Sequence, residues 1–212
     1  PVDEPMFMYL AHYAPHLPLQ APKERVEACR EKYKAGYDVL RKQRFERIRR
    51  NGLIDIEGEL PVFEKEFGGK RPAWNSLTPQ QQERWITEMA TYAAMIEIMD
   101  DGIGEVIKAT KEKGIFDNTI FLFLSDNGAT NEGDMITQLR ADLSNTPFRS
   151  YKQWCFQGGT SAPLIIMYGG GQPDGKKEAV RHEFTHIIDL FPTCLDMASI
   201  EYPREFRNQD RK

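Results

Sequence analysis

The stretch that decides the fold is Thr119-Ile-Phe-Leu-Phe-Leu-Ser125, and Asp126, Asn127 and Gly128 follow it directly. An uninterrupted apolar run of this length is typical of a strand buried on both faces, which predicts a central strand of a parallel sheet. Ligands of open α/β sheets bind just beyond the carboxyl ends of the strands. Because the side-chain oxygens of Asp126 and Asn127 are hard ligands of the kind that Ca²⁺ or Mg²⁺ takes, the sequence predicts a metal site here.

Asn127 and Gly128 also fit a simpler interpretation, because Asn-Gly is the strongest short signal for a β-hairpin turn. A hairpin needs a second strand directly after its turn. Residues 129–134 show no alternation of apolar and polar side chains, which favours the site over the hairpin.

The composition of the 212 residues is that of a globular protein, with 40% hydrophobic and 28% charged residues. This length fits one large domain or two small ones. A net charge of −4 is too close to balance to indicate a nucleic-acid partner. No apolar run approaches the roughly 20 residues that a membrane span needs, so none is predicted.

The cysteines Cys29, Cys155 and Cys194 lie far apart and form neither a zinc pattern nor a disulfide framework. Their odd number leaves at least one of them unpaired within the chain. The first residues, Pro1-Val-Asp-Glu-Pro5, lack the basic start and apolar run of a signal peptide. These features leave the redox compartment open.

Two further apolar runs, Met6–Ala11 and Ala162–Tyr168, predict buried strands. The helix that the spacing predicts most clearly opens at Thr78 and Pro79, a capping residue and a first-turn proline, and ends at Gly114. Its apolar residues recur at intervals of three and four: Trp85, Met89, Tyr92, Ile96, Met99, Ile103 and Val106. This stripe is expected to cover one face of the sheet, so the predicted fold class is α/β, with a mainly parallel sheet flanked by helices.

Helices are also expected over Lys23–Tyr33 and Tyr37–Arg50, and late in the chain from about Asp189 to Pro192 onward. The second of these carries the basic residues Arg41, Lys42, Arg44, Arg47, Arg49 and Arg50. Such a run is usual for a solvated helix face, but it also fits a basic rim that attracts a polyanionic substrate.

Two long segments are expected to be connections. Glycines and prolines punctuate residues 51–77, which predicts a surface excursion with at most a short strand. Residues 129–161 show no strong periodicity, and loops of this length in a compact domain are usually functional or disordered.

His16 lies in a segment that Pro15, Pro18 and Pro22 hold extended, because proline restricts its own φ and biases the preceding residue away from helix. The imidazole would therefore be displayed on a stiff loop after a strand end. An ordinary surface or packed histidine remains an open alternative.

Four segments together resemble the sulfatase family of the alkaline-phosphatase superfamily, in family order: Tyr9–Pro22, Phe116–Gly128, Lys152–Pro163 and Ile187–Thr193. The resemblance covers most of the chain and implies part of an alkaline-phosphatase-like sandwich. Gln157 stands where the family usually has Glu, and Thr160-Ser161 where an Arg often occurs, which leaves the subfamily open.

The resemblance implies a role for each matching polar residue. Asp126 and Asn127 would bind Ca²⁺ or Mg²⁺, and Lys152 would bind the sulfate oxygens and neutralise their charge. His16 would contact the ester oxygen and help to protonate the leaving alcohol. Cations that stabilise charge on sulfonyl oxygens, and an imidazole that transfers a proton near neutral pH, suit the cleavage of a sulfate ester.

The nucleophile of the family is a formylglycine made from Cys or Ser in a Cys-x-Pro-Ser-Arg or Cys-x-Ala-Ser-Arg context, which this sequence lacks. The family's early Asp-Asp metal ligands are also missing. The resemblance therefore implies that residues 1–212 are the later portion of one sulfatase catalytic domain, whose N-terminal part would carry the formylglycine. The chain alone is predicted to be inactive.

Other functions remain open at this point. A phosphodiesterase or phosphomutase of the same superfamily would share the metal ligand, and a non-catalytic module would bind sulfated glycans without turnover. The substrate or partner is expected to be a sulfated small molecule or a sulfated glycan. The resemblance implies a periplasmic or secreted protein, and the exposed edges of a partial sheet favour self-association.

Overall fold

The computed structural model describes residues 6–61, 65–66, 69–171, 179–203, 205–206 and 209–210. The chain divides into two compact units, Pro1–Ala179 and Val180–Lys212. All the residues of the predicted site belong to the first unit.

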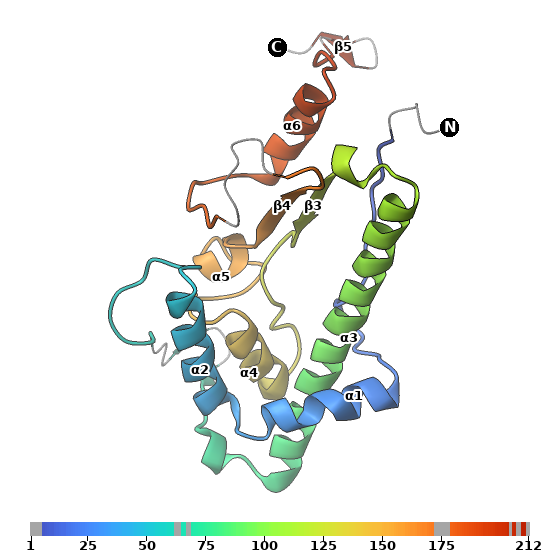
Figure 1. The fold of residues 1–212 in the computed structure, drawn as a ribbon. Coiled ribbons are helices and arrows are strands. Elements are labelled where there is room, and N and C mark those ends of the chain that lie inside the picture. The colour runs from blue at the N-terminus through green and yellow to red at the C-terminus, as the bar shows by residue number, and fades with distance from the viewer. Residues whose placement is uncertain are drawn as a thin grey trace. The chain divides into compact units, whose positions relative to one another are not determined.

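Helix α3, Pro79–Glu112, is the long green helix of Figure 1. Its start is the predicted one, because the Gln81 N–H donates to the Thr78 hydroxyl at 3.2 Å and the Thr78 N–H donates to the Gln81 side chain at 2.9 Å. This reciprocal capping box satisfies N–H groups that lack partners within the helix. Gly114 follows the helix end with a φ of +66°, which a residue without a Cβ adopts at little cost. The prediction for both ends is confirmed.

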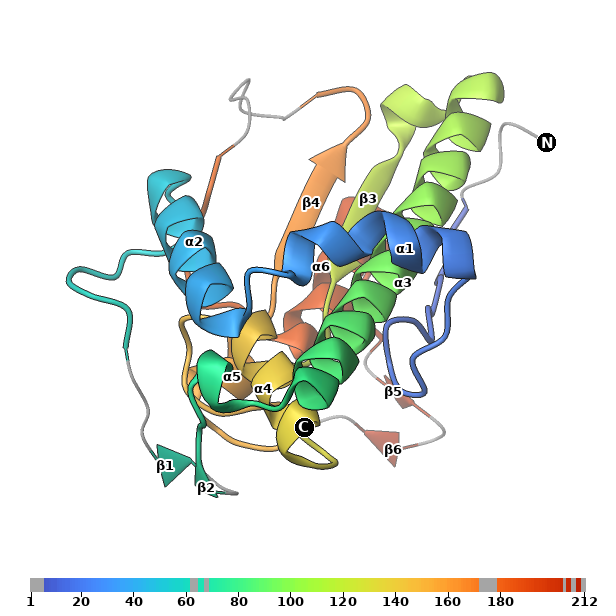
Figure 2. The ribbon, with the colours of Figure 1, turned by 90° about the horizontal axis from the view of Figure 1, so that it is seen from below.

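The two helices predicted before α3 are also confirmed. Helix α1 spans Lys23–Arg30 and continues as the short 3₁₀ helix η1, Glu31–Tyr33, while α2 spans Tyr37–Arg50. Figure 2 shows α1 crossing α3, and an ion pair of 2.6 Å between Arg30 and Glu83 joins the two helices.

Helix α4, Met135–Ser144, and the short helix α5, Gln157–Thr160, correct the prediction that residues 129–161 form a connection without periodicity. The signal for α4 was present in the sequence. Asp134 caps the helix by accepting two backbone N–H groups, and the apolar residues behind it follow at helical spacing: Ile136, Leu139 and Leu143.

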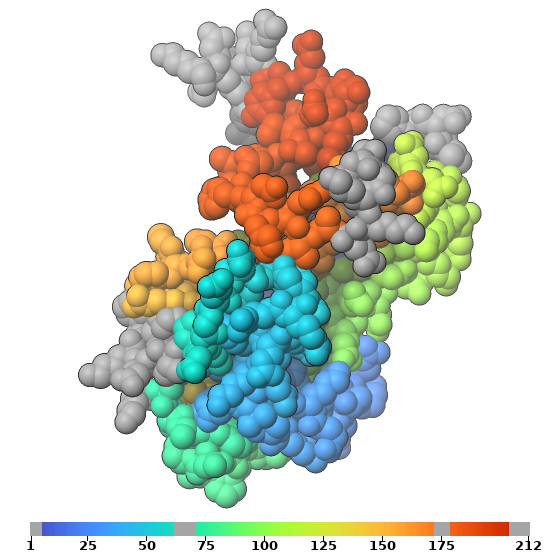
Figure 3. Space-filling model, turned by 60° about the vertical axis from the view of Figure 1, so that its left-hand side comes forward, coloured from blue at the N-terminus to red at the C-terminus, as the bar shows by residue number. Residues whose placement is uncertain are grey.

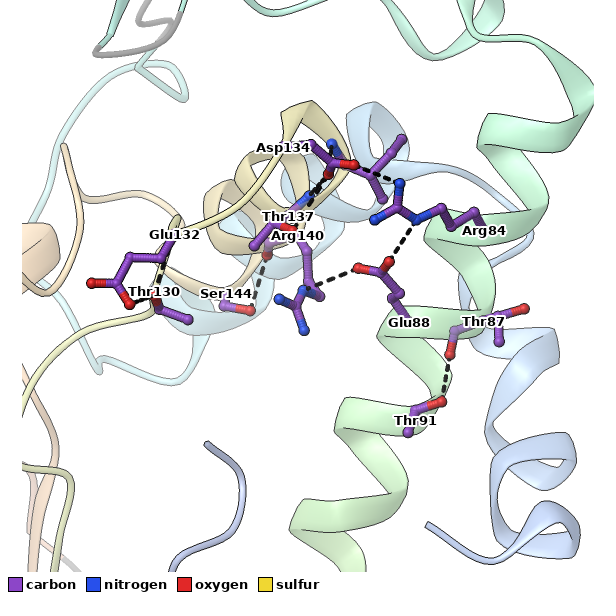
Figure 4. Close-up of polar contacts among 11 residues, drawn as sticks. Arg84, Thr87, Glu88, Thr91, Thr130, Glu132, Asp134, Thr137, Arg140 and Ser144 are labelled. Atoms are coloured by element: carbon purple, nitrogen blue, oxygen red, sulfur yellow. Dashed lines mark hydrogen bonds and ion pairs between the residues drawn. The ribbon is translucent and has the colours of Figure 1, made fainter. Parts of the chain in front are cut away.

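Charged side chains bridge α3 and α4, as Figure 4 shows. Arg84 lies 2.5 Å from a carboxylate oxygen of Asp134 and 2.8 Å from Glu88, and Arg140 lies 3.8 Å from the other oxygen of Glu88. Partial burial of Asp134 opposes its ionisation, but hydrogen bonds from Arg84 and from the helix N-terminus lower its pKa. The capping carboxylate is therefore also the charge that holds α4 against α3.

The apolar core of the first unit is formed between helices. Its buried members are Tyr37, Leu77, Trp85, Ile86, Met89, Ile136, Leu139 and Leu143. Trp85 has no exposed surface and packs with its ring centroid 5.3 Å from that of Trp74. The apolar stripe of α3 was predicted to cover the sheet. The buried half of this stripe packs on helices instead, so the prediction is wrong for that half. Farther along the same stripe, Ile96 is 37% exposed.

The strands β3, Ile120–Leu124, and β4, Leu164–Tyr168, pair in an antiparallel register that joins Ile120 to Tyr168 and Leu124 to Leu164. This corrects the predicted parallel pairing of β3 and its predicted burial on both faces, since no residue of β3 is fully buried. The reason is the connection 125–163, which leaves and returns at the same end of the sheet: the Ser125 N–H donates to the Pro163 carbonyl at 3.2 Å. A parallel partner would need a crossover to the opposite end.

Residues Met6–Ala11, predicted to be a buried strand, form irregular and exposed chain. Phe7 and Tyr9 are 79% and 84% exposed. An apolar run becomes a strand only by hydrogen bonding to a neighbouring strand, and the described part of the chain places none beside it.

The predicted surface excursion 51–77 contains a pair of two-residue strands, β1 (Lys65–Glu66) and β2 (Gly69–Lys70), and then the 3₁₀ helix η2, Trp74–Ser76. Residues 62–64 and 67–68 lie outside the described residues. Trp74 returns the segment to the core, because its ring packs edge to face against Tyr37.

The second unit contains the 3₁₀ helix η4, Ile187–Asp189, then α6, Leu190–Met197, which confirms the late helix. His186 caps η4 by accepting the Ile188 N–H at 3.2 Å, so this histidine has a structural role. The two-residue strands β5, Glu205–Phe206, and β6, Gln209–Asp210, pair with each other. Among the described helices of the chain, none combines the length and apolar character needed to cross a membrane.

Candidate functional site

Asp126 and Asn127 follow the end of β3, as the sequence predicts. The side chain of Asp126 is exposed and that of Asn127 is half-buried. Just before them, the Ser125 hydroxyl donates to the Asn127 carbonyl at 2.9 Å, which tightens the turn at the strand end. Two oxygen-bearing side chains are therefore presented together where the strand stops.

The strand end is joined to the segment that carries Lys152. The Gly128 N–H donates to the Gly159 carbonyl at 3.1 Å, and the Lys152 N–H donates to the Ala129 carbonyl at 3.0 Å. The structure thus brings the backbone that follows Asp126 and Asn127 beside the backbone of Lys152, although these residues are far apart in sequence.

Asn145, which the sequence analysis did not single out, stabilises this junction. Its side-chain oxygen accepts the Ala129 N–H at 2.9 Å, and its amide nitrogen donates to the carbonyls of Ser150 and Gly158, both at 2.8 Å. One carboxamide therefore connects the strand-end loop to both ends of the Lys152 segment. The available signal was an Asn directly after an amphipathic helix, a position where Asn is favoured as a cap.

The junction also needs glycine at position 128. A Cβ on Gly128 would collide with the Gly158 carbonyl oxygen, and this neighbour is backbone that no rotamer change can move. Gly158 is itself packed against the carbonyls of Arg149 and Ser150. The segments that contain Gly128, Arg149–Ser150 and Gly158 therefore approach one another as closely as their backbone atoms allow.

We expect Gly128→Ala to lower the free energy of unfolding of the chain by about 1–3 kcal/mol, because backbone must shift to admit the methyl group. The matched control is Gly102→Ala within α3, where an added Cβ meets nothing within 4 Å. The control should raise stability by about 0.5–1 kcal/mol, the usual gain from replacing a helical glycine. Urea unfolding measures both variants, and equal effects would contradict the close packing at Gly128.

The ammonium of Lys152 lies 3.1 Å from a carboxylate oxygen of Glu132. Lys152 follows Tyr151, whose hydroxyl donates to buried Asp142 at 2.6 Å. Burial, followed by the negative charge of Asp142, raises the pKa of Tyr151 to about 12. Tyr151 therefore stays protonated near neutral pH and anchors the backbone from which Lys152 projects.

The described contacts of His16 are local. Its Nδ1 lies 2.8 Å from the Leu17 carbonyl, its backbone N–H donates to Tyr13, and its ring packs beside the Tyr13 ring at 5.5 Å between centroids. None of these contacts joins His16 to the strand end or to Lys152. Its assignment to the site stays a prediction.

The donors at the strand end suit a hard cation as part of a larger ligand set. Asp126 and Asn127 supply two oxygen-bearing side chains, whereas Ca²⁺ takes six to eight oxygens. Over the residues that the structure describes, no group of three or more His, Cys, Asp or Glu side chains is arranged to hold a metal. Further ligands would have to come from other donors.

The basic residues of α2 divide into structural and exposed ones. The Arg41 guanidinium is buried and donates to the Thr146 hydroxyl at 3.3 Å, and Arg44 donates to the Ser144 carbonyl at 3.3 Å. Burial lowers the pKa of both guanidinium groups. The basic residues of α2 that could still form a rim are the exposed ones, Lys42, Arg47, Arg49 and Arg50. The segment that contains α2 forms part of the blue and cyan surface of Figure 3.

Comparison with known proteins defines the class of this chain. The model of the sulfatase family matches residues 1–200. The chain therefore belongs to the sulfatase family, and its fold class is the alkaline-phosphatase-like α/β fold of that family.

Individual relatives agree with this assignment. The chain is 33% identical to an uncharacterized sulfatase of Schizosaccharomyces pombe over 98% of its own length, and 31% identical to an arylsulfatase of Klebsiella aerogenes over 95%. It is also 33% identical, over 54% of its length, to the N-acetylgalactosamine-6-sulfatase of Rattus norvegicus. The chain spans 42%, 48% and 20% of these three relatives.

Proposed function

We propose that this chain is the later portion of one sulfatase catalytic domain and that the complete protein hydrolyses sulfate esters. The observation that carries the proposal is the hydrogen-bonded junction between the strand end of Asp126 and Asn127 and the segment of Lys152. This junction joins the backbone that follows Asp126 and Asn127 to the backbone of Lys152. It supports a site in which cation ligands and a cationic side chain together bind a tetrahedral anion.

Within this proposal each residue has a distinct task. Asp126 and Asn127 hold Ca²⁺ or Mg²⁺, and the bound ion supplies a Lewis acid that stabilises charge on the sulfonyl oxygens. Lys152 binds the same oxygens and compensates their negative charge. His16 donates a proton to the leaving alkoxide. The part of the domain that precedes this chain supplies the formylglycine nucleophile and the remaining metal ligands. The same part supplies the strands that complete a mainly parallel sheet.

We expect the complete protein to hydrolyse 4-nitrophenyl sulfate, and the 212 residues alone to show no turnover above the uncatalysed reaction. The complete protein should favour the sulfate over 4-nitrophenyl phosphate by about 100-fold or more in kcat/KM, because the chain belongs to the sulfatase family and its relatives include an arylsulfatase. Steady-state assays of both polypeptides with both esters test this.

Each contrary outcome of this assay has a definite meaning. Turnover by the isolated chain would overturn its assignment as an incomplete catalytic unit. Preference for the phosphate ester would indicate a phosphodiesterase or phosphomutase of the same superfamily. Binding of a sulfated glycan by the complete protein without any turnover would indicate a non-catalytic binding module.

A further inference from the structure

The ammonium of Lys152 is paired with a carboxylate of its own chain. A single oxygen of Glu132, Oε2, lies 3.1 Å from Lys152 Nζ. The Lys152 side chain is only 21% exposed, whereas that of Glu132 is 58% exposed. The lysine is therefore held within the protein, and the glutamate reaches it from the solvent side.

The loop that begins at the strand end holds Glu132 in this position. The Glu132 N–H donates to the Thr130 hydroxyl at 3.2 Å, and that hydroxyl lies 3.4 Å from Glu132 Oε2 (Figure 4). The same oxygen, Oε2, contacts Lys152. The same loop carries Asp126 and Asn127 at its start and the α4 cap, Asp134, just after Glu132. The carboxylate is thus attached to the backbone of the candidate site.

A carboxylate on Lys152 occupies the place of an anionic ligand. Its oxygens carry negative charge and accept hydrogen bonds from an ammonium group, as the oxygens of a sulfate do. Both anions cannot take the full charge of Lys152 at once, and side by side they repel each other. Because Glu132 is largely exposed, its ion pair is weak enough for a bound anion to displace it.

We propose that Glu132 is an internal competitor for the anion-binding position of Lys152. It sets the affinity of the site for sulfate esters and for the sulfate product, and this inference rests on the role of Lys152 in the proposed function. Substrate displaces the Glu132 carboxylate from Lys152, and the carboxylate returns when sulfate leaves. Glu132 therefore acts through Lys152 and takes no part in bond breaking.

The test uses the complete protein with Glu132→Gln, which keeps the side-chain shape and removes the charge. We expect two constants to fall by about threefold to fivefold: KM for 4-nitrophenyl sulfate, and the dissociation constant of inorganic sulfate measured by calorimetry. This fold-change corresponds to the free energy of an exposed ion pair, and kcat should stay within about twofold. The matched control is Glu105→Gln, which removes the same charge from an exposed pair with Lys108 on α3. The control should leave both constants unchanged.

A second background separates this inference from the function on which it rests. In Lys152→Met, the further change Glu132→Gln should no longer alter sulfate affinity, because the cation for which the two anions compete is gone. If Lys152→Met alone leaves sulfate binding and turnover intact, the proposed role of Lys152 is wrong, and the inference falls with it. If Lys152→Met weakens sulfate binding but Glu132→Gln leaves it unchanged or weakens it, only the competition is overturned.

Discussion

Replacing Asp126 with alanine in the complete protein is expected to lower kcat/KM for a sulfate ester by about 1,000-fold or more. Asp126 is a proposed metal ligand, and the loss of such a ligand removes several kcal/mol of charge stabilisation from the transition state. Asp126 is exposed at the end of β3, so its carboxylate supports no packing that the substitution would remove. The loss should therefore appear in turnover and in bound metal, measured by elemental analysis, without a matching loss of stability.

The control for this experiment is Asp117→Ala. Asp117 is an exposed carboxylate in the 3₁₀ helix η3, Phe116–Asn118, immediately before β3. The Asp117→Ala substitution removes the same charge at the opposite end of the same strand. It should leave kcat/KM within about twofold, as a substitution at an exposed position away from a site usually does. Turnover of Asp126→Ala at the level of this control, with metal still bound, would remove Asp126 from the site.

Trp85→Ala is expected to cost the chain about 3–5 kcal/mol in free energy of unfolding, the usual loss for deleting a fully buried Trp side chain. Trp85 has no exposed surface, and its ring lies between those of Tyr33, Tyr37 and Trp74, at centroid distances of 6.2, 5.7 and 5.3 Å. The cavity would open where α2, α3 and α4 meet. Thermal unfolding should report a fall in Tm of about 10 °C.

Ile96→Ala provides the comparison within the same helix. Ile96 belongs to the same apolar stripe as Trp85 but is 37% exposed. Its truncation should cost no more than about 1 kcal/mol, because much of the side chain is already in contact with water. Equal losses for the two variants would contradict the location of the core at the N-terminal half of α3.

The sequence predicted the helices well because their signals are local. The capping box of Thr78 and Gln81 and the start of α2 after Gly36 are visible within a few residues. Helix α4 carried a similar signal, Asp134 followed by apolar residues at helical spacing, and was missed only because its flanks resemble a loop.

The strands were predicted less well because their partners are distant in sequence. The composition of Ile120–Leu124 identifies a strand, but its antiparallel pairing with Leu164–Tyr168 depends on where the connection 125–163 returns. Met6–Ala11 has a similar composition and forms irregular chain, since no neighbour hydrogen-bonds to it among the described residues. Apolar composition predicts burial, and only pairing makes a strand.

By itself, the sequence predicted which residues would carry the chemistry, the oxygen donors Asp126 and Asn127 and the cation of Lys152. It also indicated the family to which the chain belongs. Only the tertiary structure decided that the strand end and Lys152 meet, through Asn145 and the close approach of Gly128 to Gly158. It also decided that Glu132 lies on the lysine. The physical reason is that residue type sets what a side chain can bind, whereas hydrogen bonds between distant backbone segments set what lies beside it.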